Sequence, residues 1–567
     1  MPYSDEEKKR ECDRIEEQFS KCRIGLKTEE IEVEELMLAM RDGVRLKTYI
    51  YRPKNYDRLP AIVFRSCYPD ADVAYRLTAR EYAKRGFAYI YQYCRGTGGS
   101  EGMWEPNVNE RNDGKDTLDW VASLDWVENI GYTGSSYLAL TGWVVADILP
   151  DKVKTMYLTH YGLFRHVSAY QDGLFRHDIL TSWTMWNAGF PIEADYLESC
   201  RFRPHMEVDE KLWGQKIDWY RKWIGSPDSD DPYWNTGFWG MLKEIPAKVN
   251  VPIYMGEGWY DHHLGSAIAT YKALSEEAKA HSTFLIGAWD HNFNFVLEGR
   301  EADQAGTDEV LRCFDWFYEI LVEKKLPDGR ILNYICNEDR WYERSTYEIE
   351  DQEKIRFYLA DRKALNSNVY ALSASPQEEP GAAQFVYDPD DPVPSHGAES
   401  LMASSADQGS LRQQPLGWRE DVLSFLSDEL ERDITVAGQI KVCLSVSSDA
   451  EDTAFAVKVM EVMPSGESYN LRSGITTLGY RGHAARRLHY EPGAPVDITV
   501  DLWDIAWKIH KGSRVRVDIT SSDFPQYAVH SNKAGVWSEQ RETKKALQQV
   551  YFGGTEHVSY IEFPVLK

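Results

Sequence analysis

Short apolar segments alternate with amphipathic helical patterns through much of the first 340 residues. A hairpin is expected at 35–52, turning at Arg41-Asp42-Gly43. The strands expected after it are 61–64, 87–92, 155–159, 252–255 and 283–286. The helices expected between and after them are 73–85, 113–124, 266–279 and 308–322. Such alternation is typical of a mostly parallel sheet with helices on both faces.

The rhythm breaks between residues 161 and 249, where the pattern is helical and rich in tryptophan. An insertion between strands of an open α/β sheet lies over the carboxyl edge of the strands, where ligands bind. We therefore predict a helical cap at 161–249, with most of its tryptophans forming the cap's own core.

After about residue 340, helical periodicity gives way to short alternating segments separated by Pro, Gly, Asp and Ser. This pattern predicts an all-β domain, a sandwich or jelly roll. Residues 373–405 are expected to form a long loop. The predicted division of the chain is a charged, solvated helical extension (1–36), an α/β core (37–160 and 250–340), the cap (161–249) and the β domain (341–567).

Composition and charge exclude several classes of protein. The 567 residues are 43% hydrophobic and carry a formal charge of −26, which disfavours nucleic acid and anionic membranes as partners and slightly favours neutral or cationic substrates. The eight cysteines lack CxxC pairs, which favours buried thiols over disulfides or a zinc site. No apolar signal core or membrane-spanning run is seen, so a soluble cytoplasmic protein is expected. The oligomeric state stays open, with a homodimer as one option.

The segment Ile130-Gly-Tyr-Thr-Gly-Ser-Ser-Tyr-Leu runs from an apolar strand into a helical pattern. A serine on such a tight turn is exposed above a helix N-terminus whose free N–H groups can stabilise an oxyanion. Gly134, two residues earlier, relieves the crowding around Ser136. Ser135 is a poorer candidate, because Thr133 would then occupy the crowded position. The alternative is an ordinary helix N-cap serine.

Two later strands end in residues that could complete a catalytic triad. Asp261 follows the strand at 252–255, and His291 follows the strand at 283–286. The order Ser136, Asp261, His291 is the order found in doubly wound hydrolases. Asp290 is an alternative to Asp261 as the acid of the triad. Because it is the neighbour of His291 in the chain, its carboxylate cannot easily reach the far nitrogen of that imidazole.

The neighbouring His262 and His263 raise the alternative of a metal site. Two consecutive residues rarely bind one ion, and no partner stands at helical spacing. The sequence therefore predicts neither a metal nor another cofactor.

Six motifs of the first 300 residues resemble those of the CocE/NonD hydrolases, the family of cocaine esterase and the X-Pro dipeptidyl-peptidases (peptidase family S15). They are Met40-Arg-Asp-Gly-Val-Arg-Leu, Arg65-Ser-Cys-Tyr-Pro, Cys94-Arg-Gly-Thr-Gly-Gly-Ser-Glu-Gly102, Gly134-Ser-Ser-Tyr-Leu, Gly258-Trp-Tyr-Asp261 and Gly287-Ala-Trp-Asp-His291. The β domain adds Ser448-Asp-Ala-Glu-Asp-Thr453, Val500-Asp-Leu-Trp503 and Ile519-Thr-Ser-Ser-Asp-Phe-Pro525. The resemblance implies an α/β-hydrolase core, an inserted helical cap and a C-terminal jelly roll.

The resemblance also implies residue roles. It makes Ser136 the nucleophile, His291 the base and Asp261 the residue that orients it. It implies an oxyanion hole made by the Tyr137 backbone N–H and the Tyr68 hydroxyl. The loop that contains Arg95-Gly96 and Glu101-Gly102 is interpreted as structural. The chain departs from the family pattern at Ala139, at Ser66-Cys67 and across the cap, and the cap difference leaves the substrate class open.

Together these patterns predict a serine hydrolase that cleaves small or medium carboxylic esters through an acyl-enzyme. His263 and Trp183 are expected to line the substrate site, with Trp143 in the core. One alternative is an amidase, an X-Pro dipeptidyl-peptidase or an amino-acid ester hydrolase, for which the acidic cap residues Glu193, Asp195 and Glu198 would bind a substrate ammonium. We regard these three as a solvated face. A carbohydrate-binding protein with an inactive core is a more distant alternative.

Overall fold

The α/β core is built on one ten-stranded sheet of order β1-β2-β4-β3-β5-β6-β9-β10-β11-β12. The computed structural model describes residues 4–300, 302–306, 308–361, 368–397, 399 and 407–567. The seven strands from β4 to β11 in this order run parallel to one another, while β1 and β2 at one edge and β12 at the other pair antiparallel. The strands are β1 (Ile31–Ala39), β2 (Arg45–Pro53), β3 (Leu59–Ser66), β4 (Ala88–Tyr93), β5 (Val127–Ser135), β6 (Val153–Thr159), β9 (Ile253–Tyr260), β10 (Thr283–Asp290), β11 (Arg330–Ile335) and β12 (Arg340–Arg344).

Helices pack on this sheet through apolar faces that the sequence places at helical spacing. They are α2 (Asp72–Lys84), α3 (Glu110–Ser123), α4 (Tyr137–Trp143), α12 (Leu264–Ala273), α13 (Glu276–Lys279) and α14 (Glu309–Phe317), with a π turn at Tyr318–Val322. Strands β3, β4, β9 and β10 are buried along their whole length. Continuous burial is expected of parallel strands covered on both faces, which explains why they appear as unbroken apolar runs.

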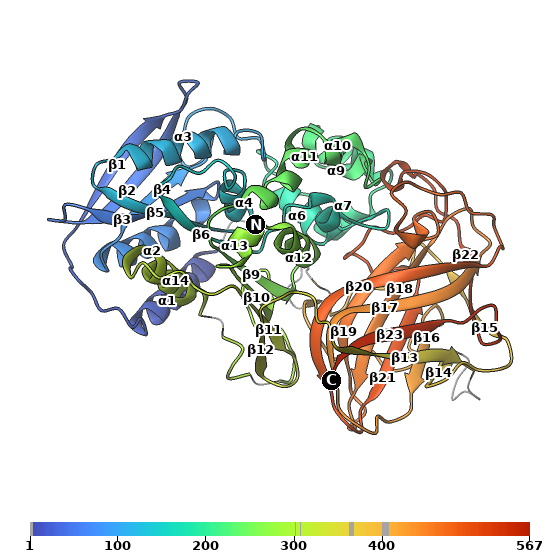
Figure 1. The fold of residues 1–567 in the computed structure, drawn as a ribbon. Coiled ribbons are helices and arrows are strands. Elements are labelled where there is room, and N and C mark those ends of the chain that lie inside the picture. The colour runs from blue at the N-terminus through green and yellow to red at the C-terminus, as the bar shows by residue number, and fades with distance from the viewer. Residues whose placement is uncertain (1–3, 301, 307, 362–367, 398, 400–406) are drawn as a thin grey trace.

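The insertion between β6 and β9 is mostly helical, as predicted, and Figure 1 shows it between the α/β core and the β domain. Its helices are α5 (Arg165–Ala169), α6 (His177–Trp186), α7 (Tyr196–Arg201), α8 (Val208–Lys211), α9 (Asp218–Gly225), α10 (Pro232–Asn235) and α11 (Gly237–Glu244), and it also contains a two-stranded ribbon, β7 (Tyr170–Gln171) and β8 (Leu174–Phe175). Four of its tryptophans are buried in the cap's own core: Trp213, Trp223, Trp234 and Trp239.

The C-terminal part is all-β and forms an eleven-stranded, largely antiparallel arrangement, so the predicted fold class is confirmed (Figure 1). Its longest strands are β17 (Ile434–Ser448) and β20 (Val496–Ile509), which pair with each other. The other strands are β13 (Gln352–Ala360), β14 (Val369–Ser373), β15 (Gly381–Tyr387), β16 (Leu423–Ser427), β18 (Ala454–Val462), β19 (Ser468–Thr477), β21 (Arg514–Thr520), β22 (Ala546–Phe552) and β23 (Tyr560–Leu566). The exact domain boundaries given above stay predictions.

Two expectations about single segments were wrong. The expected loop at 373–405 contains β15, which pairs with β22 from Gly381 to Tyr387, while residues 398 and 400–405 of it lie outside the described part. The N-terminal extension is not merely solvated. Helix α1 (Asp5–Ser20) packs against α2 and α14, and its Ile15 and Phe19 are each 3% exposed. The thin apolar stripe is enough to hold α1 on the core, because the surface of α2 and α14 against which it packs is aromatic.

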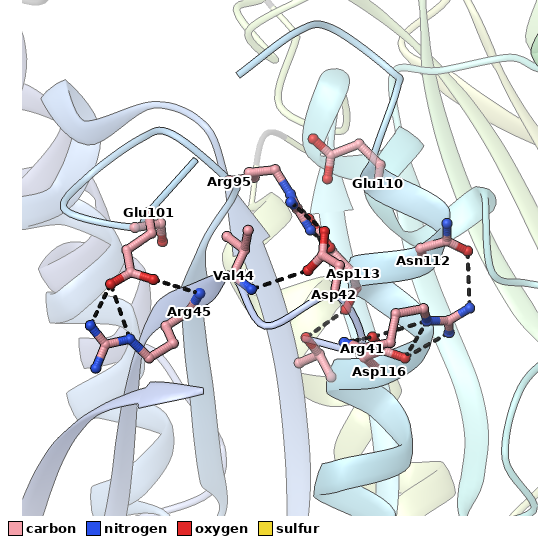
Figure 2. Close-up of polar contacts among 12 residues, drawn as sticks. Arg41, Asp42, Val44, Arg45, Arg95, Glu101, Glu110, Asn112, Asp113 and Asp116 are labelled. Carbon is pink, nitrogen blue, oxygen red and sulfur yellow. Dashed lines mark hydrogen bonds and ion pairs between the residues drawn. The ribbon is translucent and has the colours of Figure 1, made fainter. Parts of the chain in front are cut away.

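Figure 2 shows the loop network that carries two of the sequence motifs. Arg95 bridges Asp42 of the first hairpin and Asp113 of α3, both at 2.7 Å, while the Arg45 side chain pairs with Glu101. Arg41 reaches Asp116, also on α3. These contacts tie the β1–β2 turn to the loop after β4, which supports the interpretation of this loop as structural.

In the part of the chain that the structure describes, no helix combines the length and apolar character needed to cross a bilayer.

Candidate active site

Ser136 lies on a strained turn between β5 and α4. Its backbone has φ 57° and ψ −131°, a conformation that a non-glycine residue rarely adopts and that is found at functional sites. A Cβ at Gly134 would lie 2.2 Å from the Leu138 carbonyl oxygen, so this position accepts only glycine. The turn therefore presents Ser136, which is partly exposed, as predicted from the position of Gly134.

The structure brings Ser136, His291 and Asp261 together in one hydrogen-bonded row. Ser136 Oγ lies 2.9 Å from His291 Nε2, and His291 Nδ1 is in short contact with Asp261 Oδ2. Asp261 Oδ1 accepts the His263 backbone N–H at 2.6 Å. With Nδ1–H donating to the carboxylate, Nε2 is free to accept the serine proton. Parallel strands β5, β9 and β10 end at the same sheet edge, which explains how residues 155 positions apart meet.

Asp290, the competing acid, has other partners. Its Oδ1 accepts the backbone N–H groups of Asn292 at 2.8 Å and Asn294 at 3.0 Å. It therefore shapes the loop that carries His291, and the imidazole contacts Asp261 instead.

Within this row, His291 and Asp261 shift each other's pKa, and each shift favours the charged form. Burial alone would lower the pKa of His291, but the adjacent Asp261 carboxylate outweighs it and raises the pKa above 6.5. Burial would raise the pKa of Asp261, but His291 and His262 hold it well below its usual range. Asp261 thus stays ionised and orients the imidazole.

A buried pair behind the row was not singled out from the sequence. Glu257, on β9, is 1% exposed, and burial together with the Asp261 charge raises its pKa well above the usual range. His160, just after β6, is fully buried, and its ring centroid lies 5.3 Å from that of His291. Burial lowers the pKa of His160 to about 3. These shifts favour the uncharged form of both groups and leave Asp261 as the anion of the cluster.

Two sets of side chains have the composition of a metal site. Asp261, His262 and His291 form one, and His160, Glu257 and Asp261 the other, with the possible ligand atoms of each set within 4.8 Å of one another. Both sets use Asp261, whose two oxygens already accept hydrogen bonds from His291 and the His263 N–H. A cation there would compete with the Ser–His–Asp row. That no metal is needed stays a prediction.

Tyr68 and Tyr137 lie on adjacent elements beside the serine. Tyr68 follows β3, and its hydroxyl accepts a 3.0 Å hydrogen bond from Trp183 Nε1 of the cap. Burial raises the pKa of Tyr68 well above its usual range, so the phenol keeps its proton and can donate it. Tyr137 begins α4, where backbone N–H groups lack intrahelical partners. The Tyr137 hydroxyl donates a 3.2 Å hydrogen bond to Glu110, the first residue of α3.

The two residues expected to line the substrate site have defined partners. His263 is 3% exposed, and its Nδ1 lies 3.0 Å from Ser168 Oγ of the cap. Trp183 is partly exposed and stacks on Tyr137 with ring centroids 5.9 Å apart. Trp143 is fully buried, as expected of a core residue. The acidic residues Glu193, Asp195 and Glu198 are exposed, in agreement with a solvated face.

Comparison with known proteins places these features in a family context. Residues 42–292 match the X-Pro dipeptidyl-peptidase (S15) family, and residues 327–562 match the C-terminal non-catalytic domain of X-Pro dipeptidyl-peptidases. The cocaine esterase of Rhodococcus sp. (strain MB1 Bresler) is 27% identical over 94% of this chain and 98% of its own length.

Solved structures show the same fold. An α-amino acid ester hydrolase superposes with a TM-score of 0.80 at 21% identity, covering 96% of this chain and 98% of its own. An aminopeptidase from a marine-sediment Thaumarchaeota archaeon superposes with a TM-score of 0.79 at 20% identity, covering 95% and 97%. At these identities the likeness concerns the fold alone.

Proposed function

The chain belongs to the CocE/NonD and X-Pro dipeptidyl-peptidase (S15) hydrolases, and from that premise we propose that Ser136, His291 and Asp261 are its catalytic triad. The observation that carries this proposal is the hydrogen-bonded row from Ser136 Oγ through His291 to Asp261, with Ser136 on a strained turn. Ser136 attacks the ester carbonyl while His291 takes its proton, and the alcohol leaves with that proton. Water activated by His291 then releases the acid from the acyl-enzyme.

The oxyanion of each tetrahedral intermediate is assigned to two donors, the Tyr137 N–H and the Tyr68 hydroxyl. Trp183 donates to the Tyr68 oxygen, so the phenol O–H remains a donor that can be offered to the substrate. Preorganised donors of this kind stabilise charge as it develops. Trp183, which contacts Tyr68, and His263, whose ring lies 5.9 Å from that of His291, are assigned to substrate binding.

We favour small or medium carboxylic esters as substrates over amides and aminoacyl compounds. Recognition of a substrate ammonium would need acidic groups at the site, and the cap's Glu193, Asp195 and Glu198 are exposed instead. A panel of p-nitrophenyl esters compared with X-Pro and aminoacyl amides separates these alternatives, because a carboxylesterase would favour the esters, whereas an amidase or peptidase would favour the amides. A fluorophosphonate that failed to label the protein would instead support an inactive, ligand-binding core.

The assignment of the nucleophile is tested with two neighbouring serines. Ser136→Ala should abolish ester turnover with the fold intact, while the matched variant Ser135→Ala should keep most of it. Mass spectrometry after organophosphate treatment should find the adduct on Ser136. An adduct on Ser135 would overturn the assignment.

A further inference from the structure

The cap contains a buried arginine that has no carboxylate partner. Arg165, the first residue of α5, is 8% exposed. Within the described residues, no ion pair or side-chain hydrogen bond engages it, and its Nε is buried without a partner. Each of the other buried arginines there pairs with an acidic residue: Arg65, Arg85, Arg176, Arg472 and Arg516. Because an unpaired buried charge is costly, the exception at Arg165 requires an explanation.

Aromatic stacking holds Arg165 in place without using its hydrogen-bond donors. The guanidinium carbon lies 4.9 Å from the ring centroid of Trp223 and 5.9 Å from that of Trp239. A cation–π contact engages the flat face of the guanidinium, whereas its N–H groups point outward in its plane. Burial lowers the pKa of Arg165, yet a guanidinium remains protonated in proteins. The group is therefore a fixed cation with free in-plane donors.

Two chains of contacts connect Arg165 with the proposed catalytic residues. Ser168, one turn further along α5 and on the same helix face, contacts His263, whose backbone N–H binds Asp261. In the other chain of contacts, the Trp223 ring that stacks on Arg165 lies 6.0 Å from Trp183, which donates to Tyr68. The charge of Arg165 acts on both Tyr68 and His263. The cation thus lies in the part of the cap that is close enough to the proposed site for its charge to act on Tyr68 and His263.

We propose that Arg165 binds a carboxylate of the substrate, so that the preferred substrates are small esters carrying a second, anionic carboxylate near the scissile bond. The inference rests on the proposed esterase function and narrows its substrate class. A guanidinium offers two parallel N–H groups that match the two oxygens of a carboxylate. It repels an ammonium, which is opposite to the recognition that an aminopeptidase requires.

This inference runs against the overall charge of the chain, which is −26. Long-range repulsion acts on the approach of an anionic substrate and is screened by salt, whereas a buried contact is screened much less. Association of an anionic ester should therefore become faster as the salt concentration rises, although the bound state depends on Arg165.

The test uses two pairs of esters that differ in one charge. The first pair is mono-p-nitrophenyl glutarate and p-nitrophenyl valerate, with the charge on the acyl side. The second pair is the butyrate esters of 4-hydroxybenzoate and 4-hydroxybenzamide, with the charge on the leaving group. The wild-type protein should prefer the charged member of at least one pair in kcat/KM. Arg165→Gln should reduce that preference by about 10- to 100-fold, the loss expected for a hydrogen-bonded charge, and Arg165→Lys should restore part of it.

Arg201→Gln is the matched control, because it removes the same charge from an exposed arginine of the cap. It should leave the charged-to-neutral preference unchanged.

Should Arg165→Gln fail to fold, inhibition of the wild-type protein still tests the inference: glutarate should compete with p-nitrophenyl butyrate more strongly than glutaramide does. Absence of any charge preference in the wild type, or a preference that survives Arg165→Gln, would overturn the inference while leaving the esterase proposal intact. Activity that survives Ser136→Ala would instead overturn the esterase proposal.

Discussion

At the scale of single residues, the Tyr68 hydroxyl joins the α/β core to the cap. It accepts from Trp183 Nε1 at 3.0 Å, and this contact fixes the direction in which the phenol can donate. Tyr68→Phe should lower kcat by roughly 10²–10³, about the contribution of one oxyanion donor. Trp183→Phe, which keeps an aromatic ring but loses the hydrogen bond, should lower kcat less. Steady-state kinetics on an ester whose chemistry limits the rate would measure both effects.

The control for this pair is Tyr56→Phe, which removes an exposed tyrosine hydroxyl and should leave kcat unchanged. Melting temperatures should stay close to wild type for all three variants. An unchanged kcat in Tyr68→Phe would exclude this hydroxyl from the oxyanion hole.

The dependence of activity on pH follows from the charges around His291. Only the neutral imidazole can accept the serine proton, so activity should rise as pH rises through the pKa of His291. Asp261 raises that pKa, so the midpoint in kcat/KM should lie above 6.5. The raised pKa of Glu257 favours its uncharged form, so Glu257→Gln should leave the midpoint in place.

A pH profile measured for both proteins makes this prediction decisive. If Glu257 were ionised, its charge would stabilise the His291 imidazolium, and Glu257→Gln would move the midpoint to lower pH. Such a shift would show that the cluster holds two anions, contrary to the assignment above.

The functional residues that lie in a recognisable local sequence pattern could be predicted. Those whose importance depends on residues far away in the chain could not. Ser136 follows a glycine on a strand-to-helix turn, and Asp261 and His291 each follow a strand, so all three are visible in the sequence. No sequence pattern around Arg165 marks it, because what distinguishes this residue is the absence of a carboxylate partner in the folded protein. Glu257 resembles any residue of a buried strand until the fold brings Asp261 beside it.

At the scale of secondary-structure elements, α1 is held by a very small apolar surface. Phe19 contacts Tyr82 and Phe314 edge-on, with centroid distances of 6.0 and 5.9 Å. Phe19→Ala should cost about 3–5 kcal/mol, the usual loss for a buried phenylalanine, and this should be enough to release the helix. Limited proteolysis between residues 21 and 30 should then become faster. Leu26→Ala, at a residue 50% exposed, is the control and should not change the cleavage rate. A cleavage rate that stays at the wild-type value in Phe19→Ala would show that α1 is held by other contacts.

The two elements that were predicted wrongly share a cause. Helix α1 has a strongly charged sequence, and β15 lies in a stretch rich in Pro, Ala, Glu and Ser. Neither segment forms structure from its own apolar content. Each depends on a partner elsewhere in the chain, the aromatic surface of α2 and α14 for α1 and the paired strand β22 for β15. Periodicity within a window cannot report a partner that lies outside that window.

At the scale of the whole molecule, the β domain supports both the cap and the loop that carries Asp261. Arg176 of the cap pairs with Glu399, which also pairs with Arg472 of β19, and all three are buried. Arg176 stacks on Trp503 of β20, and a Cβ at Gly265 of α12 would lie 2.6 Å from the same indole. Since α12 begins three residues after Asp261, movement of the β domain would disturb the triad directly.

A second contact between the β domain and the cap lies at the surface and depends on charge. Residues 480–486 face an acidic part of the cap: Tyr480 donates to Asp228 at 2.6 Å, and Arg486 pairs with Asp230 at 2.7 Å. His483 lies between Asp172 of the cap, at 3.1 Å, and Asp501 of β20, at 3.3 Å. Its hydrogen bonds to Asp172 and Asp501 raise the pKa of His483 to about 10.

The pH dependence of this contact can be predicted from the sign of that shift. Because the folded protein holds the His483 proton more tightly than the unfolded chain, its stabilisation is complete below about pH 6.5 and is lost as pH rises towards about 10. The side chain is 44% exposed, so the contribution is limited to about 0.2–1 kcal/mol.

His483→Asn removes the charge while tolerating the φ of 56° at this position. The variant should melt below wild type at pH 6, and the difference should shrink by pH 10. His489→Asn, at an exposed histidine whose ion-pair partner is the nearby Glu491, controls for the loss of an imidazole. A difference in melting temperature that stays constant between pH 6 and pH 10 would show that His483 packs against the cap without holding it by charge.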